Sequence, residues 1–182
     1  VSYTCNMFQP WWKVELSFEI EISQIIIWNR MDCCSFGLSN SDVIIFDNGN
    51  NEVASRYIDD SNHVEKFKFE FADGTFGSTV MVKLRGTEVL SLAEVEVLSY
   101  SDSARPSISS IPTIQPSISH HPSISPQPSI SSIPSMNPTR PVFNVATSGT
   151  ATQSCSQRMG TASRAIDDNR DGNFDNGSVT AT

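Results

Sequence analysis

The residues of this chain best suited to chemistry lie in an acidic turn near its C-terminal end. Residues 164–173 read Arg-Ala-Ile-Asp-Asp-Asn-Arg-Asp-Gly-Asn, so carboxylate, amide and carbonyl oxygens are concentrated in a short segment. Ca²⁺ takes about six to eight oxygen ligands, and backbone carbonyls serve alongside carboxylates. Two interpretations fit these residues equally well: a calcium-binding loop, or a turn in which Asx side chains bond the backbone without a metal. An EF-hand is excluded because Ser178, not glutamate, is the twelfth residue from Asp167.

A second group with chemical potential is Arg30-Met31-Asp32-Cys33-Cys34. Consecutive Cα atoms lie about 3.8 Å apart, below the roughly 4.4–6.8 Å usual for a disulfide. A bond between Cys33 and Cys34 would therefore form a compact, rigid, apolar knob. Beside it, the guanidinium of Arg30 is suited to bond the hydroxyls of a sugar. Two free thiols, or two bridges to other cysteines, remain open as alternatives.

The segment that must position this group is residues 10–34. Apolar side chains recur at every second position and predict a strand with one core face: Trp12, Val14, Leu16, Phe18 and Ile20. After a bend at Glu21–Ser23, the β-branched run 24–28 predicts a second, buried strand. This strand delivers Arg30 and the cysteines to the end of a sheet, where binding groups commonly collect.

The rest of residues 1–100 predicts an all-β domain. Alternating or β-branched runs, separated by turn signals such as Asn48-Gly49, predict strands at 42–47, 52–57, 64–71, 79–84 and 90–98. No segment has helical periodicity, so we expect an antiparallel β-sandwich. The polar stretch 59–63, which includes His63, is interpreted as a structural loop because the sequence offers no second cluster of ligands beside it.

Residues 101–141 differ abruptly in composition. They contain nine of the ten prolines and four Pro-Ser-Ile-Ser units, at 106–109, 116–119, 122–125 and 128–131. Proline interrupts the hydrogen-bond ladder of a sheet, so we predict an extended linker leaning towards polyproline II. The chain is thus expected to comprise 1–100, a disordered linker at 101–141, and 142–182.

Charge and cysteine content narrow the classes of function. The formal net charge of −8 argues against a nucleic-acid partner, which requires clustered Lys and Arg. No apolar run approaches the length of a membrane span. The four cysteines allow three pairings, and the Ser/Pro linker favours a secreted or cell-surface protein over a cytosolic one. No pair of a nucleophile and a base stands out, so we expect no enzymatic activity.

Several motifs together resemble a known family. PWWKVEL at 10–16, NRMDCC at 29–34, LRGTEVLSLAEVEVL at 84–98 and the segment 144–180 are similar to the F-type lectin (fucolectin) branch of the F5/8 type C, discoidin-like domains. The resemblance implies a galactose-binding-like jelly roll. It also implies that 1–100 is the C-terminal part of one module and 142–182 the N-terminal part of the next. We expect these parts to complement each other in circularly permuted order.

The resemblance implies a Ca²⁺ site shared by the two parts. Three side chains would be ligands: Asp167, Ser178 and Glu94, which lies in the last strand. The main-chain carbonyls of Arg164, Asn169 and Ala93 would complete the set. The cysteine pair that the family often places at the positions of Val179 and Ala93 is missing. We expect Cys5 and Cys155 to form a different bridge.

The resemblance also implies a sugar site at Arg30, Asp32, Cys33, Cys34 and Tyr3. The family's histidine position is Tyr3 in the first module and Ala181 in the second, and its second basic position is Gly37, so the pattern for tight fucose recognition is incomplete.

These motifs predict a calcium-dependent carbohydrate-binding module of a multi-domain extracellular protein. Its partners would be glycans or glycoproteins, bound multivalently if modules repeat along the chain. The alternative is a discoidin-like adhesion or protein-interaction module without a working sugar site.

Overall fold

The computed structural model describes residues 7–32, 35–100, 141–156 and 160–182. They form an antiparallel β-sandwich, as predicted. The strands are β1 (Trp11–Trp28), β2 (Ser41–Phe46), β3 (Glu52–Ile58), β4 (Lys66–Glu70), β5 (Phe76–Leu84), β6 (Glu94–Tyr100), β7 (Val142–Asn144) and β8 (Thr150–Gln153). Four short 3₁₀ helices are described as well: η1 (Ser35–Leu38), η3 (Ala146–Ser148), η4 (Ala162–Ile166) and η5 (Phe174–Asn176).

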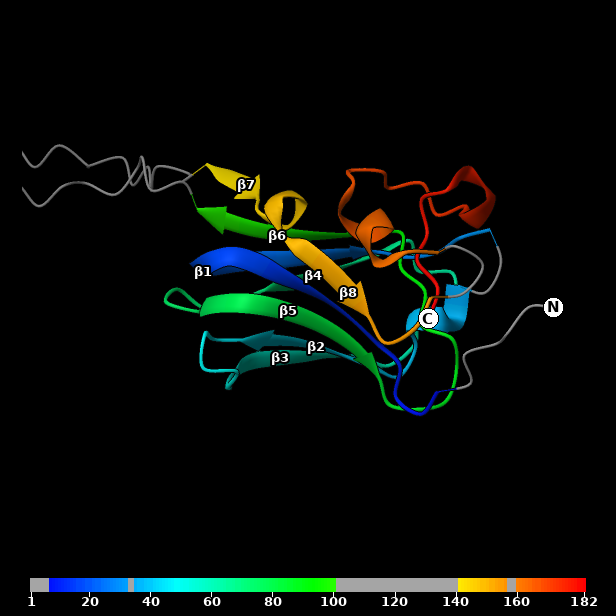
Figure 1. The fold of residues 1–182 in the computed structure, drawn as a ribbon, viewed down its shortest axis with the longest axis horizontal. Helices are drawn as coiled ribbons and strands as arrows, with labels where there is room; N and C mark the ends of the chain where they lie inside the picture. The colour runs from blue at the N-terminus through cyan, green and yellow to red at the C-terminus, as the bar shows by residue number, and fades with distance from the viewer. Residues whose placement is uncertain (1–6, 33–34, 101–140, 157–159) are drawn as a thin grey trace, which may run out of the picture.

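Strand β1 belongs to both layers of the sandwich. Its first half pairs with β5 on one side and β8 on the other, in a layer that continues through β2 to β3. Its second half pairs with β4 and β6, and β6 pairs in turn with β7. Figure 1 shows β1 crossing the molecule in the first layer, turning back near its middle and returning in the second. We call the two layers the β5 layer and the β6 layer.

The prediction of two separate strands is wrong, because Trp11–Trp28 is one continuous strand, although the chain does bend near its middle. Two shifts of register accompany the bend, one between Glu15 and Ile20 against β5 and one between Ile22 and Gln24 against β6. Such shifts bend and twist a strand without ending it. They allow β1 to leave one layer and enter the other.

The core lies between the two layers and contains most of the predicted apolar positions, while Ile26 is only partly buried and outside it. Trp12, Val14, Ile25 and Ile27 are fully buried, together with residues from every layer and from η4. Phe18, expected on the core face, is 64% exposed. It lies within the register shift between Glu15 and Ile20, where the period-two pattern no longer follows the core.

Residues 142–182 pack directly onto residues 7–100. Strand β8 extends the β5 layer beside β1, and β7 extends the β6 layer beside β6, as Figure 1 shows. The amides of Thr180 and Thr182 donate to the carbonyls of Leu92 and Leu90, at 2.8 and 2.9 Å. The indole N–H of Trp12 donates to the carbonyl of Ala162 at 2.9 Å. The two parts of the chain therefore share one core and both layers.

Several strand limits differ from the prediction. Strand β6 begins at Glu94 rather than at residue 90, β5 begins at Phe76 rather than at 79, and β4 is confined to Lys66–Glu70. The segment 59–63 is a loop, and its Ser61 is buried and bonded to Ser35 and Ser39, which agrees with a structural role. Among the described residues, no helix has the length and apolar character needed to cross a lipid bilayer.

Candidate functional site

The acidic turn is held by its own side chains. Each Asx residue at 167, 169, 171 and 173 accepts a hydrogen bond from the backbone amide two residues later, at 3.0–3.1 Å. Four successive Asx turns curl the segment, so that the hydroxyl of Ser178 donates to the carbonyls of Asp171 and Asn173. The Asx side chains therefore bond the backbone of the turn, which is a feature of one of the two interpretations. This geometry is compatible with a metal site as well as with a turn that holds none.

Glu94 lies under this turn and is fully buried. Its Oε1 accepts a bond from the amide of Asp168 at 3.3 Å, and its Oε2 has no hydrogen-bond partner. Among the described residues, no Lys or Arg forms an ion pair with it. Buried carboxylates are normally paired with a cation or bound to a metal. The surroundings of the Glu94 carboxylate therefore favour a bound cation.

The same surroundings change the acidity of Glu94. Burial is the main reason why the pKa of Glu94 is raised to about 8. The carboxylates of Asp167 and Asp168 act in the same direction, and the amides of these two residues act against it. Without a bound cation, Glu94 therefore retains a proton over much of the neutral pH range.

Two of the other predicted calcium ligands are next to these residues in the chain. Asp167 precedes Asp168 in the turn, Ala93 precedes Glu94, and the carbonyl of Ala93's neighbour Leu92 accepts the bond from Thr180. The described residues include no group of three or more His, Cys, Asp or Glu side chains suited to a metal. Carbonyl and hydroxyl oxygens would have to complete a calcium shell, as the predicted set of ligands assumes. The set remains a prediction.

Arg30 and Asp32 form the second cluster, at the end of β1. Arg30 donates from Nε and Nη2 to the two carboxylate oxygens of Asp32, at 2.6 and 2.9 Å. The guanidinium carbon lies 4.9 Å from the centroid of the Phe174 ring, and that of Arg164 lies 5.5 Å from it. Sequence reasoning missed Phe174 because nothing in η5 marks it as different from a core aromatic.

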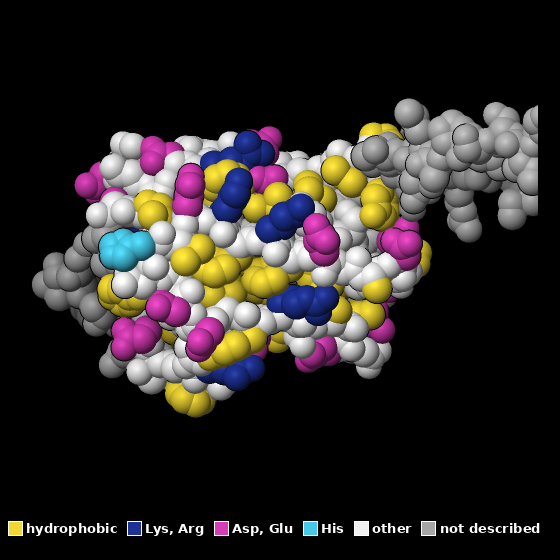
Figure 2. All heavy atoms as spheres, turned by 180° about the vertical axis from the view of Figure 1, so that it is seen from behind, with side chains coloured by type: hydrophobic (Ala, Val, Ile, Leu, Met, Phe, Trp, Pro, Cys, Tyr) yellow, Lys and Arg dark blue, Asp and Glu magenta, His cyan; other side chains and the backbone are white. Residues whose placement is uncertain are grey.

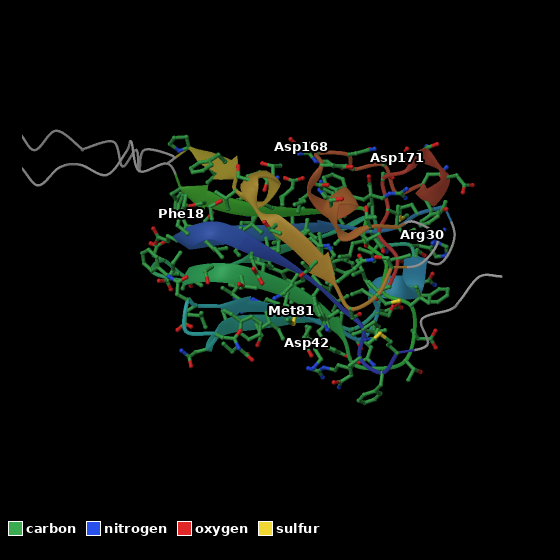
Figure 3. The ribbon with its side chains drawn as sticks, in the orientation of Figure 1. Phe18, Arg30, Asp42, Met81, Asp168 and Asp171 are labelled. Atoms are coloured by element: carbon green, nitrogen blue, oxygen red, sulfur yellow. The ribbon has the colours of Figure 1, made fainter. Side chains whose placement is uncertain are left out.

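The turn and the Arg30 cluster are joined through the backbone. The amide of Met31 donates to the carbonyl of Gly172 at 2.8 Å, and the amide of Phe174 donates to Asp32 at 3.3 Å. Figure 3 shows Arg30 and Asp171 towards one end of the molecule and Phe18 at the opposite end, with Asp168 between them on the upper edge. One loop therefore contacts both candidate clusters.

Gly172 is expected to be essential for this contact. A Cβ atom there would lie 2.8 Å from the carbonyl oxygen of Asn29 and 2.8 Å from the amide nitrogen of Met31. Gly172→Ala should therefore push the loop away from β1 and cost about 1–3 kcal/mol of unfolding free energy, measured by urea denaturation. Gly86→Ala is the matched control, because a Cβ there meets nothing within 4 Å. Equal effects of the two variants would contradict the prediction.

A third cluster lies beside Glu94. Glu96, two residues along β6, accepts bonds from Trp28 Nε1 and Arg170 Nε, both at 2.6 Å. The guanidinium of Arg170 and the ammonium of Lys66 lie 5.4 and 4.7 Å from the Trp28 ring. This cluster was not predicted, although Glu94 and Glu96 are spaced to share one face of a strand.

Some predicted residues lie outside the described part of the chain: Tyr3, Cys5, Cys33 and Cys34. Cys155 is disulfide-bonded, and its partner also lies outside the described residues, so the pairing with Cys5 remains a prediction. The two further positions of the sugar pattern are described. Ala181 is 4% exposed, and at Gly37 a side chain would meet Ser91 Oγ at 2.6 Å. Neither position has room for a basic side chain without rearrangement.

The fold and the loop cluster at one end of the sandwich define a class of galactose-binding-like domain. A family model described as the NedA-like galactose-binding domain of the F5/8 type C group matches residues 1–82. Residues 1–82 are therefore similar to the F5/8 type C galactose-binding-like family, the resemblance that the motifs predicted.

The relatives within that family are fucolectins. The chain is 37% identical over 100 residues to Fucolectin-1 of Anguilla japonica, covering 53% of this chain and 56% of the relative. It is 34% identical over 97 residues to Fucolectin-6 of the same species, covering 53% and 52%. The chain thus spans about half the length of the curated relatives it matches. These relatives are lectins and not enzymes, in agreement with the expectation for this chain.

Solved structures of lectins are similar as well. The lectin domain of lectinolysin, complexed with Lewis B antigen, is 31% identical, with a TM-score of 0.48 and coverage of 50% of this chain and 66% of that chain. A Streptococcus pneumoniae fucose-binding module is 38% identical, with a TM-score of 0.45 and coverage of 48% and 61%. A fucolectin from Morone saxatilis serum is 32% identical, with a TM-score of 0.47 and coverage of 53% and 35%.

Proposed function

We propose that this chain is a calcium-dependent carbohydrate-binding module of a multi-domain extracellular protein. The main support is the relationship to fucolectins together with the cluster of Arg30, Asp32 and Phe174 at the end of β1. A guanidinium fixed by a carboxylate in two hydrogen bonds is a rigid donor group suited to sugar hydroxyls. The ring of Phe174 adds an apolar surface beside it.

We propose that the ligand is a glycan and that it is not bound through the family's complete set of fucose contacts. Two of the three basic or histidine positions of that pattern are occupied by Ala181 and Gly37, both closely packed. A sugar hydroxyl left without its partner in a buried site costs roughly 1–3 kcal/mol. Weak single sites become useful when several modules act together, which suits the predicted linker and repeated modules of an extracellular protein.

Calcium is proposed as the resident cation under the acidic turn. Glu94, with its unpartnered Oε2, supports this assignment, and Asp167, Ser178 and the carbonyls of Ala93, Arg164 and Asn169 are the further ligands we propose. When bound, Ca²⁺ supplies the positive charge that compensates these carboxylates. Because the ligands come from both parts of the chain, the ion would also strengthen the packing of one part on the other.

A glycan array on the full chain tests the sugar proposal. We expect binding in the presence of Ca²⁺, weaker binding after EDTA treatment, and at least tenfold weaker binding by Arg30→Ala. Arg56→Ala is the matched control, since Arg56 also lies against an aromatic ring, 4.7 Å from Phe71, but on another part of the surface. A silent array from a protein that calcium still stabilises would overturn the sugar proposal and favour the protein-interaction module.

A further inference from the structure

The two glutamates of β6 beneath the acidic turn have different partners. Glu94 and Glu96 point to the same face of β6 because side chains alternate along a strand, and both are buried. Glu96 is compensated by the guanidinium of Arg170, whereas Glu94 is contacted by backbone amides of the turn, such as that of Asp168, and by no cationic side chain of the described residues. The strand therefore presents one neutralised carboxylate and one that is available to a cation.

Arg170 lies in the middle of the acidic turn, between Asn169 and Asp171. Its Nε donates to Glu96 at 2.6 Å, and its guanidinium carbon lies 5.4 Å from the Trp28 ring. Trp28 is itself fixed, because its indole N–H donates to the same Glu96 oxygen and Lys66 lies 4.7 Å from its ring centroid. The turn is thus attached by a side chain to two neighbouring strands, β1 and β6.

We propose that Arg170 is a positioning residue that holds the acidic turn over Glu94, and thereby sets the affinity of the calcium site. This inference rests on the proposed calcium function. A guanidinium cannot ligate Ca²⁺, so Arg170 acts only through the residues on either side of it. Partners that orient metal ligands typically contribute about tenfold to a hundredfold in affinity.

The charges of Arg170 and Glu96 must be separated from their positioning effect. Removing Arg170 alone would also take away a positive charge that repels the cation. The loss of this repulsion by itself strengthens cation binding and would oppose the positioning effect. The double variant Arg170→Met with Glu96→Gln removes one charge of each sign, so the net charge around the site is unchanged. The amide oxygen of the new Gln side chain can still accept the bond from Trp28.

The structure offers a matched control on the β5 layer. Arg85 donates to Asp42 in two bonds at 2.7 and 2.8 Å, and its guanidinium carbon lies 4.3 Å from the Tyr57 ring. Figure 3 shows Asp42 well apart from Asp168 and Asp171. The double variant Arg85→Met with Asp42→Asn therefore removes the same kind of pair without touching the turn.

Terbium luminescence excited through tryptophan, followed by displacement with Ca²⁺, gives the affinities in the full chain. We expect the Arg170/Glu96 double variant to bind Ca²⁺ about tenfold more weakly, and the Arg85/Asp42 variant to bind like the wild type. The terbium lifetime in H₂O and D₂O counts bound waters. We expect about one more water in the Arg170/Glu96 variant because a displaced ligand is replaced by solvent, an effect that a general loss of stability does not produce.

The outcomes distinguish this inference from the proposal on which it depends. If the Arg170/Glu96 variant binds Ca²⁺ with the same affinity and the same number of bound waters as the wild type, the inference is overturned but the calcium proposal stands. No terbium binding by the wild type would overturn the calcium proposal and the inference with it. If the double variant does not fold, Arg170→Lys replaces it: this variant keeps the charge but lacks the guanidinium fork, so we expect about threefold weaker binding, and unchanged binding would overturn the inference.

Discussion

Glu94→Gln is expected to abolish the rise in melting temperature that Ca²⁺ gives to the wild-type protein. Calcium at about 100 times its Kd should stabilise the wild type by about 2.7 kcal/mol, which corresponds to roughly 5–10 °C for a domain of this size. Glutamine keeps the shape of the side chain but removes the buried negative charge that favours the cation. Differential scanning calorimetry with Ca²⁺ and with EDTA measures the difference.

The control for this variant is Glu88→Gln, which changes an exposed glutamate in the loop before β6. It should keep the full calcium effect. A Glu94→Gln protein that Ca²⁺ still stabilises by the wild-type amount would contradict the assignment of Glu94.

Without calcium, Glu94→Gln should be the more stable of the same two proteins. Between the ordinary pKa of 4.5 and the raised value of about 8, the folded protein holds a proton on Glu94 that the unfolded chain releases. The unfolding free energy of the calcium-free wild type should therefore fall as the pH rises through this interval. Glu94→Gln cannot ionise, so at pH 8 in EDTA it should be more stable than the wild type by about 4 kcal/mol, because each unit of pKa shift corresponds to about 1.4 kcal/mol. Parallel pH curves for the two proteins would contradict this explanation.

Trp12→Ala is expected to have the largest effect on folding, a loss of about 3–5 kcal/mol. The side chain is fully buried in the common core, and its indole N–H donates to Ala162 in the second part of the chain. The variant loses apolar contacts and leaves the Ala162 carbonyl without this donor. Urea denaturation followed by circular dichroism measures the loss.

Trp11→Ala is the matched control for this variant. Trp11 is the neighbouring residue of β1, lies on the other face of the strand and is only partly buried. Its replacement should cost about 1 kcal/mol. If the two tryptophan variants lost the same stability, the packing of the second part of the chain around Trp12 would be refuted.

Local sequence patterns predicted the class of fold because they determine which face of each strand is buried. Trp12, Val14, Ile25 and Ile27 are core residues, and Leu16 packs against them. The pattern failed at Phe18, where β1 shifts register. A shift of register depends on the partner strand, and no property of the residues in β1 alone reveals it.

The sequence also predicted part of the candidate site. Composition marked the Asx residues of the turn, and the family resemblance pointed to Glu94. The division of roles between Glu94 and Glu96 depends on Arg170, which is 74 positions away in sequence from Glu96. The contact of Phe174 with Arg30 likewise joins the two parts of the chain. Contacts of this kind arise only when the two parts pack together.

The shared core has a consequence for the integrity of the protein. Each part of the chain supplies an edge strand or central strands to both layers, so neither part can bury its apolar residues alone. A single proteolytic cut between residues 100 and 141 would leave the contacts in place but turn an intramolecular association into a bimolecular one. From then on, dilution alone would separate the fragments, and the proposed calcium and glycan sites would be lost together.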